Sequence, residues 1–430
     1  MKIYLFLFYL LFYLTSASAE NLVFYIESAY KNNPILNAER KNVKAVKENI
    51  SISRSEFLPN LSITANKTSS NSTNRTNQSG TNLSDSSSDT ETKTISVDQK
   101  VFQGFQGYNS LKKSQLELKR QKLELKKVEQ EIILEAATIY LDLIYKEKGK
   151  NFNLSNVDLF ERQVESDSAR LQKGEITLTD LAQAESSLAG AKASLITAET
   201  ELLTTKTEFE RIIRVEVPDS NELKVDLNIK LPKNLIEALN LAKKNSPQLL
   251  IAQLNYNIAQ KDLNIEKSKL SPSASINYSK SKNDDFSATV DNVDEETVKA
   301  TITWPLIKGG KNFSSIKKAK YNKEQRNLLL DDAVNGVKSS TTNAWSIYQS
   351  AESVLDSTKA QLKAAEIANE GISLEYDSGN TRTTLEVIQS RSLLLNARIT
   401  KAKAERDFVI SKFSLLKEIG TLSMEAVKSI

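Results

Sequence analysis

The chain contains a long internal duplication: the segment from about residue 20 to 215 is followed by a second version from about residue 233 to 420. The two versions align without a gap over their first parts, and the offset between them then changes only inside loops. Insertions confined to loops are expected when two copies of one folding unit diverge, so the duplication predicts a fold built twice. Matched pairs include Pro34 with Pro247, Pro59 with Pro272, Tyr140 with Trp345, and Gly174 with Gly379.

The first nineteen residues have the composition of a secretory signal. One cation, Lys2, precedes an apolar run over residues 3–14, and small residues at 17–19 resemble a cleavage site. An uncleaved membrane anchor is the alternative, but the run is shorter than the ~20 residues that a spanning helix requires. We therefore predict a signal peptide over residues 1–19.

The composition argues against several classes of function. The chain has no cysteine and no histidine, which excludes disulfides and an amino-terminal lipid on cysteine, and removes the usual catalytic triads and zinc sites. We therefore expect that the protein is not an enzyme and that it binds no cofactor or metal. The 58 basic and 54 acidic residues nearly balance and are spread along helices, so nothing indicates a nucleic-acid partner.

Each copy contains a proline-free helical stretch, from about Gln106 to Lys173 and from about Asn312 to Ser378. At 1.5 Å per residue each helix would be roughly 100 Å long. Their apolar residues recur every seven positions, which predicts helices packed side by side. Glycines at 174 and 379 then end each stretch before a second stripe begins, so each copy should form one antiparallel helical hairpin with its tip at the glycine. The first stripe contains Leu111, Leu118, Leu125, Ile132 and Ile139.

Apolar and polar residues alternate in two shorter regions, about 57–103 and 271–306, and predict a pair of strands in each copy. Strands of about ten residues suit a tilted membrane strand. The polar segments 68–90 and 281–296 are predicted as the exposed loops between them. Because four strands cannot close a barrel and an open edge is not stable in lipid, the protein should oligomerise. Two protomers would give a filled barrel, whereas three could leave a lumen.

Several motifs at these positions resemble the TolC-type outer membrane efflux proteins, over essentially the whole mature chain. FLPNLSI and LSPSASI resemble the family's strand entries, VFQGFQG and LIKGGKN its strand-to-helix turns, and KGEITLTDLAQAE and YDSGNTRTTLEVIQSR its helical tips. The resemblance implies a homotrimer in the outer membrane of a Gram-negative-type bacterium, in which a twelve-stranded barrel continues into a twelve-helix periplasmic tunnel. A mixed belt would include a linker at 216–232 and the tail at 421–430.

The same resemblance implies a periplasmic gate made by a small polar network near the tips. The matching positions are Thr179, Asp180, Tyr376 and Arg382, together with Gln163 on a looser alignment. An arginine and a tyrosine can both donate to one carboxylate, and a few such bonds cost little to break during opening. The alternative is that these are ordinary helix-capping and surface residues, because carboxylates are favoured at helix starts.

A second feature implied by the resemblance is an acidic constriction of the pore. Glu386 matches one of its positions, and three copies would form a charged ring, a common selectivity device. The neighbouring position is Gln389, which departs from the expected acid, and Asn380 adds one residue to the second tip motif.

These observations together predict a passive export duct. Its partners would be a periplasmic adaptor (membrane fusion) protein and an inner membrane transporter, because the chain has no phosphate-binding motif to supply energy. The cargo, small molecules or a protein secreted by a type I system, is not identified. The main alternative is a structural periplasmic coiled-coil or adaptor protein without channel activity, which would lack the paired strands. A trimeric adhesin would not repeat them internally.

Overall fold

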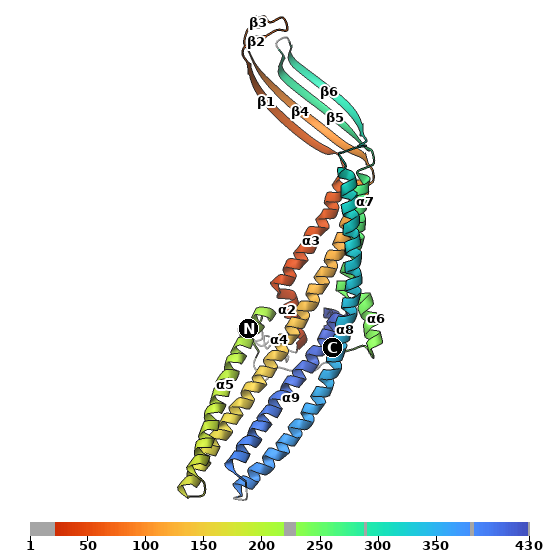
Figure 1. Cartoon of the computed structure of the whole chain (residues 1–430). Helices are drawn as coiled ribbons and strands as arrows, with labels where there is room; N and C mark the ends of the chain where they lie inside the picture. The colour runs from red at the N-terminus through yellow and green to blue at the C-terminus, as the bar shows by residue number, and fades with distance from the viewer. Residues whose placement is uncertain (1–21, 219–228, 288–289, 379–381, 429–430) are drawn as a thin grey trace, which may run out of the picture. The chain divides into compact units, whose positions relative to one another are not determined.

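The computed structural model describes residues 22–218, 229–287, 290–378 and 382–428, so the predicted signal peptide and Gly379 lie outside the described residues. Helices dominate the fold (Figure 1). In the first copy they are α2 (Leu22–Asn32), α3 (Pro34–Ser55), α4 (Gln106–Gln172) and α5 (Leu178–Ile213). In the second copy they are α6 (Leu235–Asn245), α7 (Pro247–Ser268), α8 (Lys311–Asp377) and α9 (Thr384–Glu418), followed by α10 (Met424–Lys428).

Equivalent helices of the two copies have nearly equal lengths. Helices α2 and α6 have 11 residues each, α3 and α7 have 22, and α4 and α8 have 67. Both 22-residue helices begin at a proline, Pro34 or Pro247, a residue that suits the first helical position because it lacks an N–H that would be unpaired there anyway. The duplicated long helices predicted from the sequence are therefore confirmed.

One antiparallel sheet joins the two copies, in the order β1 (Asn60–Ser72), β4 (Ser86–Gln103), β5 (Ser273–Ser287) and β6 (Val290–Thr303). Two short strands, β2 (Arg75–Thr76) and β3 (Asn82–Leu83), pair with each other in the segment that connects β1 to β4. The predicted ten-residue strands and the loops at 68–90 and 281–296 were wrong in extent, because the main strands run well into both segments. Backbone pairing continues there through polar residues, which carry no alternation of apolar side chains to reveal a strand.

The two faces of the sheet differ in polarity. On one face Tyr278 pairs with Val298 and Ala274 with Ile302, while on the other Ser275 pairs with both Lys100 and Thr301. The apolar face is open to solvent in the protomer: Ile302 is 79% exposed and Ile63, on β1, is 75% exposed. The predicted alternation is present, and it leaves an apolar surface that nothing covers within the described protomer.

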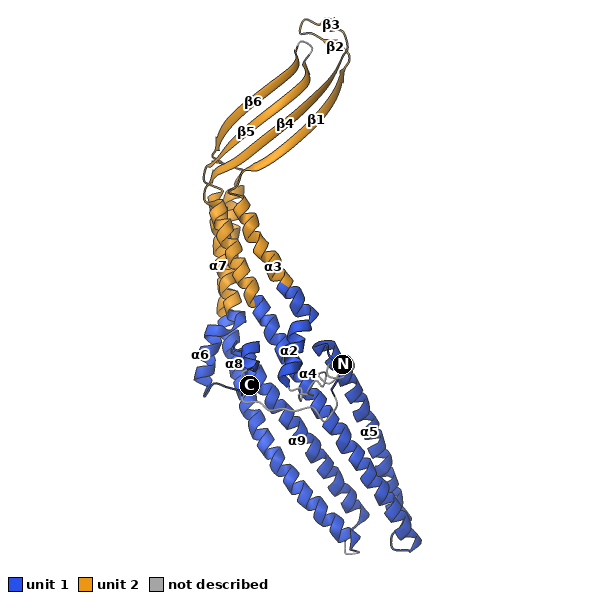
Figure 2. Cartoon of the chain, turned by 180° about the vertical axis from the view of Figure 1, so that it is seen from behind, with its two compact units in different colours: residues 1–40, 124–249, 333–430 blue, residues 41–123, 250–332 orange. Residues whose placement is uncertain are grey.

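The chain divides into two compact units, each assembled from both copies (Figure 2). Unit 1 contains residues 1–40, 124–249 and 333–430, and unit 2 contains residues 41–123 and 250–332. The sheet lies in unit 2 with most of α7 and with parts of α3, α4 and α8. Among the described helices, none combines the length and hydrophobicity of a membrane-spanning segment.

The main core of unit 1 is formed by helices from both copies and by the chain after Gly420. Tyr25 of α2 contacts Tyr140 of α4 and Phe209 of α5, with ring centroids 5.3 and 5.4 Å apart, and all three are fully buried. The amide of Gln130 donates to the Leu422 carbonyl, and α10 adds Met424 and Val427 to the core. Burying a large apolar side chain contributes about 1.5–3 kcal/mol, so this cluster anchors the start and the end of the described chain together.

Candidate functional site

The tip of the first hairpin is a tight turn between α4 and α5. Gly174 adopts a left-handed φ of +74°, and the amides of Gly174 and Glu175 donate to the carbonyls of Leu171 and Arg170, closing the end of α4. Helix α5 then begins with a capping box, in which the Thr177 hydroxyl accepts from the Asp180 amide and the Asp180 carboxylate accepts from the Thr177 amide at 2.9 Å. The predicted turn at Gly174 is therefore closed by backbone hydrogen bonds at the end of α4 and by a capping box at the start of α5.

In the second hairpin, α9 also begins with a capping box. Thr383 is the N-cap, and the Glu386 carboxylate accepts from its amide at 2.8 Å. Arg382 joins α8 to the start of α9, since its guanidinium donates to the carboxylates of Glu375 at 2.6 Å and Glu386 at 2.9 Å. The pair Thr383 and Glu386 thus occupies the positions of Thr177 and Asp180 in the other copy.

A buried carboxylate connects the two hairpins. Asp167 of α4 has no exposed surface, and one of its oxygens, Oδ1, accepts from the Tyr376 hydroxyl of α8 at 2.6 Å and from the Gln163 amide at 2.9 Å. The Tyr376 hydroxyl also lies 3.1 Å from the Thr384 hydroxyl at the start of α9. The Arg170 guanidinium stacks over the Tyr376 ring, 4.5 Å from its centroid. These contacts join α4, α8 and α9 within unit 1.

Burial and hydrogen bonding shift the pKa values of several groups at the tips. Burial, and then the bond to Asp167, raises the pKa of Tyr376 above its ordinary value. Hydrogen bonds from the Thr177 side chain and amide lower the pKa of Asp180, and the Thr383 amide followed by Arg382 lowers that of Glu386. Burial lowers the pKa of Arg391, whose guanidinium donates to the Leu159 carbonyl at 3.0 Å.

The predicted gate residues divide into two groups in the structure. Tyr376 and Gln163 meet at Asp167, whereas Asp180 bonds to Thr177 and Arg382 bonds to two glutamates. Thr179 is exposed beside the first cap. Within the protomer, therefore, the tyrosine and the arginine donate to different carboxylates, and Asp180 fills the capping role that the sequence left as the alternative.

The predicted constriction residues lie on α9. Glu386 and the exposed Gln389 line an open groove between α8 and α9, together with small and apolar residues such as Ala365 and Leu393. Glu386 is held by Arg382 and its own cap. The described residues include no group of three or more acidic side chains placed to hold a metal ion. The groove is therefore a surface of mixed polarity with one fixed carboxylate.

Sequence reasoning missed Asp167, although a signal for it existed. Steps of seven from Ile139 pass through the polar residues Lys146 and Asn153 and then reach Phe160 and Asp167. An acid at a core-facing position of a heptad pattern is costly unless it is paired, so this position predicts a buried hydrogen-bond donor nearby. Arg170, Thr384 and Glu375 have no comparable pattern, because their roles depend on which helices meet.

Comparisons with known proteins agree with this architecture. The profile of the family described as "Outer membrane efflux protein" matches residues 25–213 and 238–421. The outer membrane efflux protein BepC of Brucella suis is 26% identical over 415 residues, covering 95% of this chain and 87% of BepC. The outer membrane protein TolC of Escherichia coli is 23% identical over 421 residues, covering 95% of this chain and 83% of TolC.

A solved structure shows the same fold. The Campylobacter jejuni CmeC outer membrane channel superposes with a TM-score of 0.81 at 14% identity, covering 96% of this chain and 90% of CmeC. The duplicated hairpins and four-stranded sheet thus have the same fold as CmeC. The profile match extends over most of the chain, so the chain belongs to the outer membrane efflux protein family, a family of channel proteins located in the outer membrane.

Proposed function

We propose that three copies of this chain form a passive duct through which an inner membrane transporter and a periplasmic adaptor protein export small molecules. Type I secretion of a protein is the second use that such a duct permits. The observation that carries the proposal is the sheet, whose two outer strands, β1 and β6, each leave one edge unpaired within the protomer. Open strand edges are unstable in lipid, and a neighbouring protomer supplies the missing partner.

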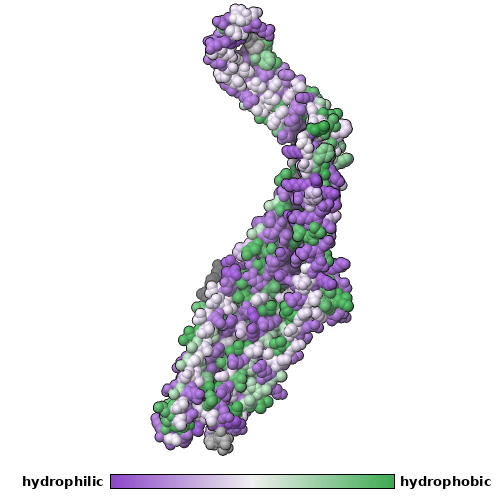
Figure 3. Space-filling model, viewed as in Figure 1, coloured by the Kyte–Doolittle hydropathy of each residue, from purple (hydrophilic) through white to green (hydrophobic). Residues whose placement is uncertain are grey.

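The surface of unit 2 supports this placement in a membrane. Leu61 and Ile302 are exposed on the apolar face of the sheet, and large apolar side chains also gather where the strands join the helices (Figure 3). There the indole of Trp304 donates to the Leu270 carbonyl while the side chain stays 63% exposed. Aromatic residues flanking an apolar band are typical of strands at a membrane interface. Other exposed members are Phe57, Phe105, Leu306, Ile307 and Phe313.

The tips suit a gate that opens and closes. Bonds between hairpins, such as Tyr376 to Asp167, hold the helices together within a protomer, and each is worth about 0.5–3 kcal/mol net. We assign the gate to Gln163, Thr179, Asp180, Tyr376 and Arg382, with Gly174 at the turn of the first hairpin. Glu386 and Gln389 would face the pore beside it. A partner protein that docks on the tips could shift this balance, because a two-state equilibrium responds to any ligand that binds one state better.

Disulfide cross-linking tests the proposed closure, because the chain contains no cysteine of its own. Ile63→Cys on β1 is combined in turn with cysteine at successive positions of β6, from Val298 to Ile302, and oxidised in the membrane. We expect cross-linked dimers and trimers at the positions that share a face and register, and none with Ile63→Cys alone. Monomer at every position, from protein shown to be folded, would contradict closure through β1 and β6.

A further inference from the structure

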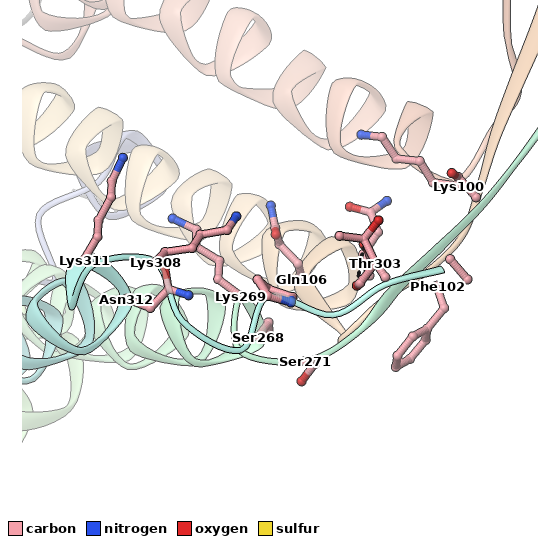
Figure 4. A pocket seen from close by; sticks show the side chains of 15 residues that line it. Lys100, Phe102, Gln106, Ser268, Lys269, Ser271, Thr303, Lys308, Lys311 and Asn312 are labelled. Atoms are coloured by element: carbon pink, nitrogen blue, oxygen red, sulfur yellow. Dashed lines mark hydrogen bonds between the residues drawn. The ribbon is translucent and has the colours of Figure 1, made fainter. Parts of the chain in front are cut away.

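A cluster of lysines lines a pocket of unit 2 at the junction between strands and helices. Lys100 comes from β4, Lys269 directly follows α7, Lys308 lies in the turn before α8, and Lys311 is the first residue of α8. In Figure 4, Lys269, Lys308 and Lys311 extend to the same side of the ribbon, and the Lys100 amine points back toward them from the strand. Four cations from three segments therefore converge on one open pocket.

Most of this positive charge is unbalanced. Lys269 forms an ion pair with Glu266 at 2.6 Å, whereas among the described residues no carboxylate lies within ion-pair distance of Lys100, Lys308 or Lys311. The nearest acid on the same face of β4, Asp98, accepts from Asn277 instead. Like charges held together without counter-ions repel one another, so the pocket attracts anions.

One helix start adds to this field. The first residues of α4 and α8, Gln106 and Lys311, both line the pocket, and a helix start carries about half a positive charge. Neither helix has an acidic residue in its first turn, whereas α5, α6 and α9 all do. At the start of α4 a carboxylate oxygen of Glu56 would lie 3.4 Å from a Cβ added to Gly107, so an acid stands beside that helix start. The start of α8 is therefore the one that adds positive charge beside the lysines.

The backbone keeps the pocket in place. Gly104 connects β4 to α4 with a φ of +58°, and a Cβ added there would lie 2.4 Å from the Ser271 side chain and 2.6 Å from the Ser268 carbonyl. Only glycine permits such an approach without displacement of the neighbouring turn. The close contact holds the start of α4 against the end of α7, where Lys269 lies.

Of the four lysines, Lys100 is the one that lies on the sheet, and it lies on the polar face. Lys100 pairs with Ser275, and Ser273 pairs with Thr303, which also lines the pocket. The apolar residues Ala274 and Ile302 pair on the opposite face, although Ala274 and its other partner, Phe102, also line the pocket. If the apolar face contacts lipid, as the proposed trimer requires, the lysines face the lumen at the base of the sheet, where a dissolved anion and not a lipid headgroup would reach them.

We infer that this cluster, the lysine collar (Lys100, Lys269, Lys308 and Lys311), binds anionic groups of cargo in transit and favours anions over cations at the base of the strands. The inference rests on the proposed trimeric duct, because three copies of the collar then surround one lumen. Rings of lysine or arginine are the usual selectivity device of anion and phosphate pores, and a lumen wall of one charge concentrates counter-ions.

The test compares channels in planar bilayers with inorganic triphosphate as the probe. The variant replaces Lys100, Lys308 and Lys311 with glutamine, and the control makes the same change at Lys41, Lys44 and Lys47, three exposed lysines of α3 in the same unit. We expect triphosphate to block the wild type and the control alike, with block weakened about tenfold or more in the variant. The reversal potential in a KCl gradient should shift toward cation preference in the variant alone.

Three other outcomes would overturn the lysine collar and leave the proposed duct standing. Equal block and equal reversal potential in variant and wild type would show that the lysines do not act on the permeating ions. An equal change in the control would assign the effect to total charge. If the variant loses bound phosphatidylglycerol while its block by triphosphate is unchanged, the lysines form a lipid site. A wild type that forms no channel would refute the duct itself, which separates the two proposals.

Discussion

The Tyr376 hydroxyl donates a 2.6 Å hydrogen bond to Asp167, a carboxylate with no exposed surface that lies 209 residues away in the sequence. The bond crosses from the second helical hairpin to the first, so it couples the two copies of the duplicated unit at their tips. The other oxygen of Asp167, Oδ2, is buried without a hydrogen-bond partner among the described residues. An acid held by so few donors depends strongly on each of them.

Tyr376→Phe should therefore loosen the tip without disturbing the rest of unit 1. The substitution leaves Asp167 with only the Gln163 amide, at an expected cost of about 1–3 kcal/mol of local stability. Hydrogen exchange over residues 160–172 measures this cost as faster exchange. Tyr348→Phe is the control, since its hydroxyl forms no hydrogen bond with other described residues. Equal exchange in wild type and Tyr376→Phe would contradict the role of the bond.

The starts of α5 and α9 should weaken in acid. The pKa values of Asp180 and Glu386 are both lowered in the folded protein. The stability that they contribute is therefore present above the ordinary carboxyl pKa of about 4 and is lost as pH falls through the lower folded values. Hydrogen exchange over 178–182 and 384–388, corrected for the intrinsic effect of pH, should show both segments opening as pH falls below about 4.

Asp180→Asn provides the matched control for this pH dependence. It removes the titrating group from the first cap and leaves the second, built on Thr383 and Glu386, intact. In that variant we expect the acid-dependent opening to disappear over 178–182 and to persist over 384–388. If the acid-dependent opening disappeared at both segments, or at neither, the two caps would not titrate as separate units.

A charge on the apolar face of the sheet should block assembly in the membrane. Ile302 lies on that face and its neighbour Thr301 on the polar one, so Ile302→Arg and Thr301→Arg differ only in the direction of the side chain. A lipid-facing arginine costs about 2–4 kcal/mol near the middle of the bilayer and less near its surface. We expect Ile302→Arg to lower the yield of membrane-inserted oligomer and Thr301→Arg to leave it nearly unchanged. A loss of oligomer with Thr301→Arg but not with Ile302→Arg would show that the polar face, and not the apolar face, contacts lipid.

Much of the fold could be predicted because its patterns are long and local. The heptad stripes predicted α4 and α8 to within about a residue at each end, and Gly174 marked the turn between α4 and α5. The strands were harder. Residues such as Ser70 and Ser88 pair across β1 and β4, but serine-rich segments have no apolar face, so they were assigned to a loop.

The site was less predictable, because its bonds join residues that are distant in sequence. Positions such as Tyr376 and Arg382 could be proposed from their motif, but their acceptors, Asp167 and Glu375, depend on how α4 and α8 meet. The core of unit 1 shows the same limit. Tyr25, Tyr140 and Phe209 meet only after three helices pack, and no periodicity in any one helix indicates that contact.

Single-channel conductance of the purified protein in planar bilayers tests the central claim, a trimeric duct closed at its tips. Wild type is compared with Asp180→Ala, Arg382→Ala and Tyr376→Phe at the tips. The control is Arg211→Ala, because Arg211 also contacts two glutamates but lies at the end of α5 that is far from the tip. We predict low conductance for wild type and Arg211→Ala and higher conductance for the tip variants. Unchanged conductance in every tip variant would contradict the gate, and no channel from protein verified as folded and trimeric would contradict the duct.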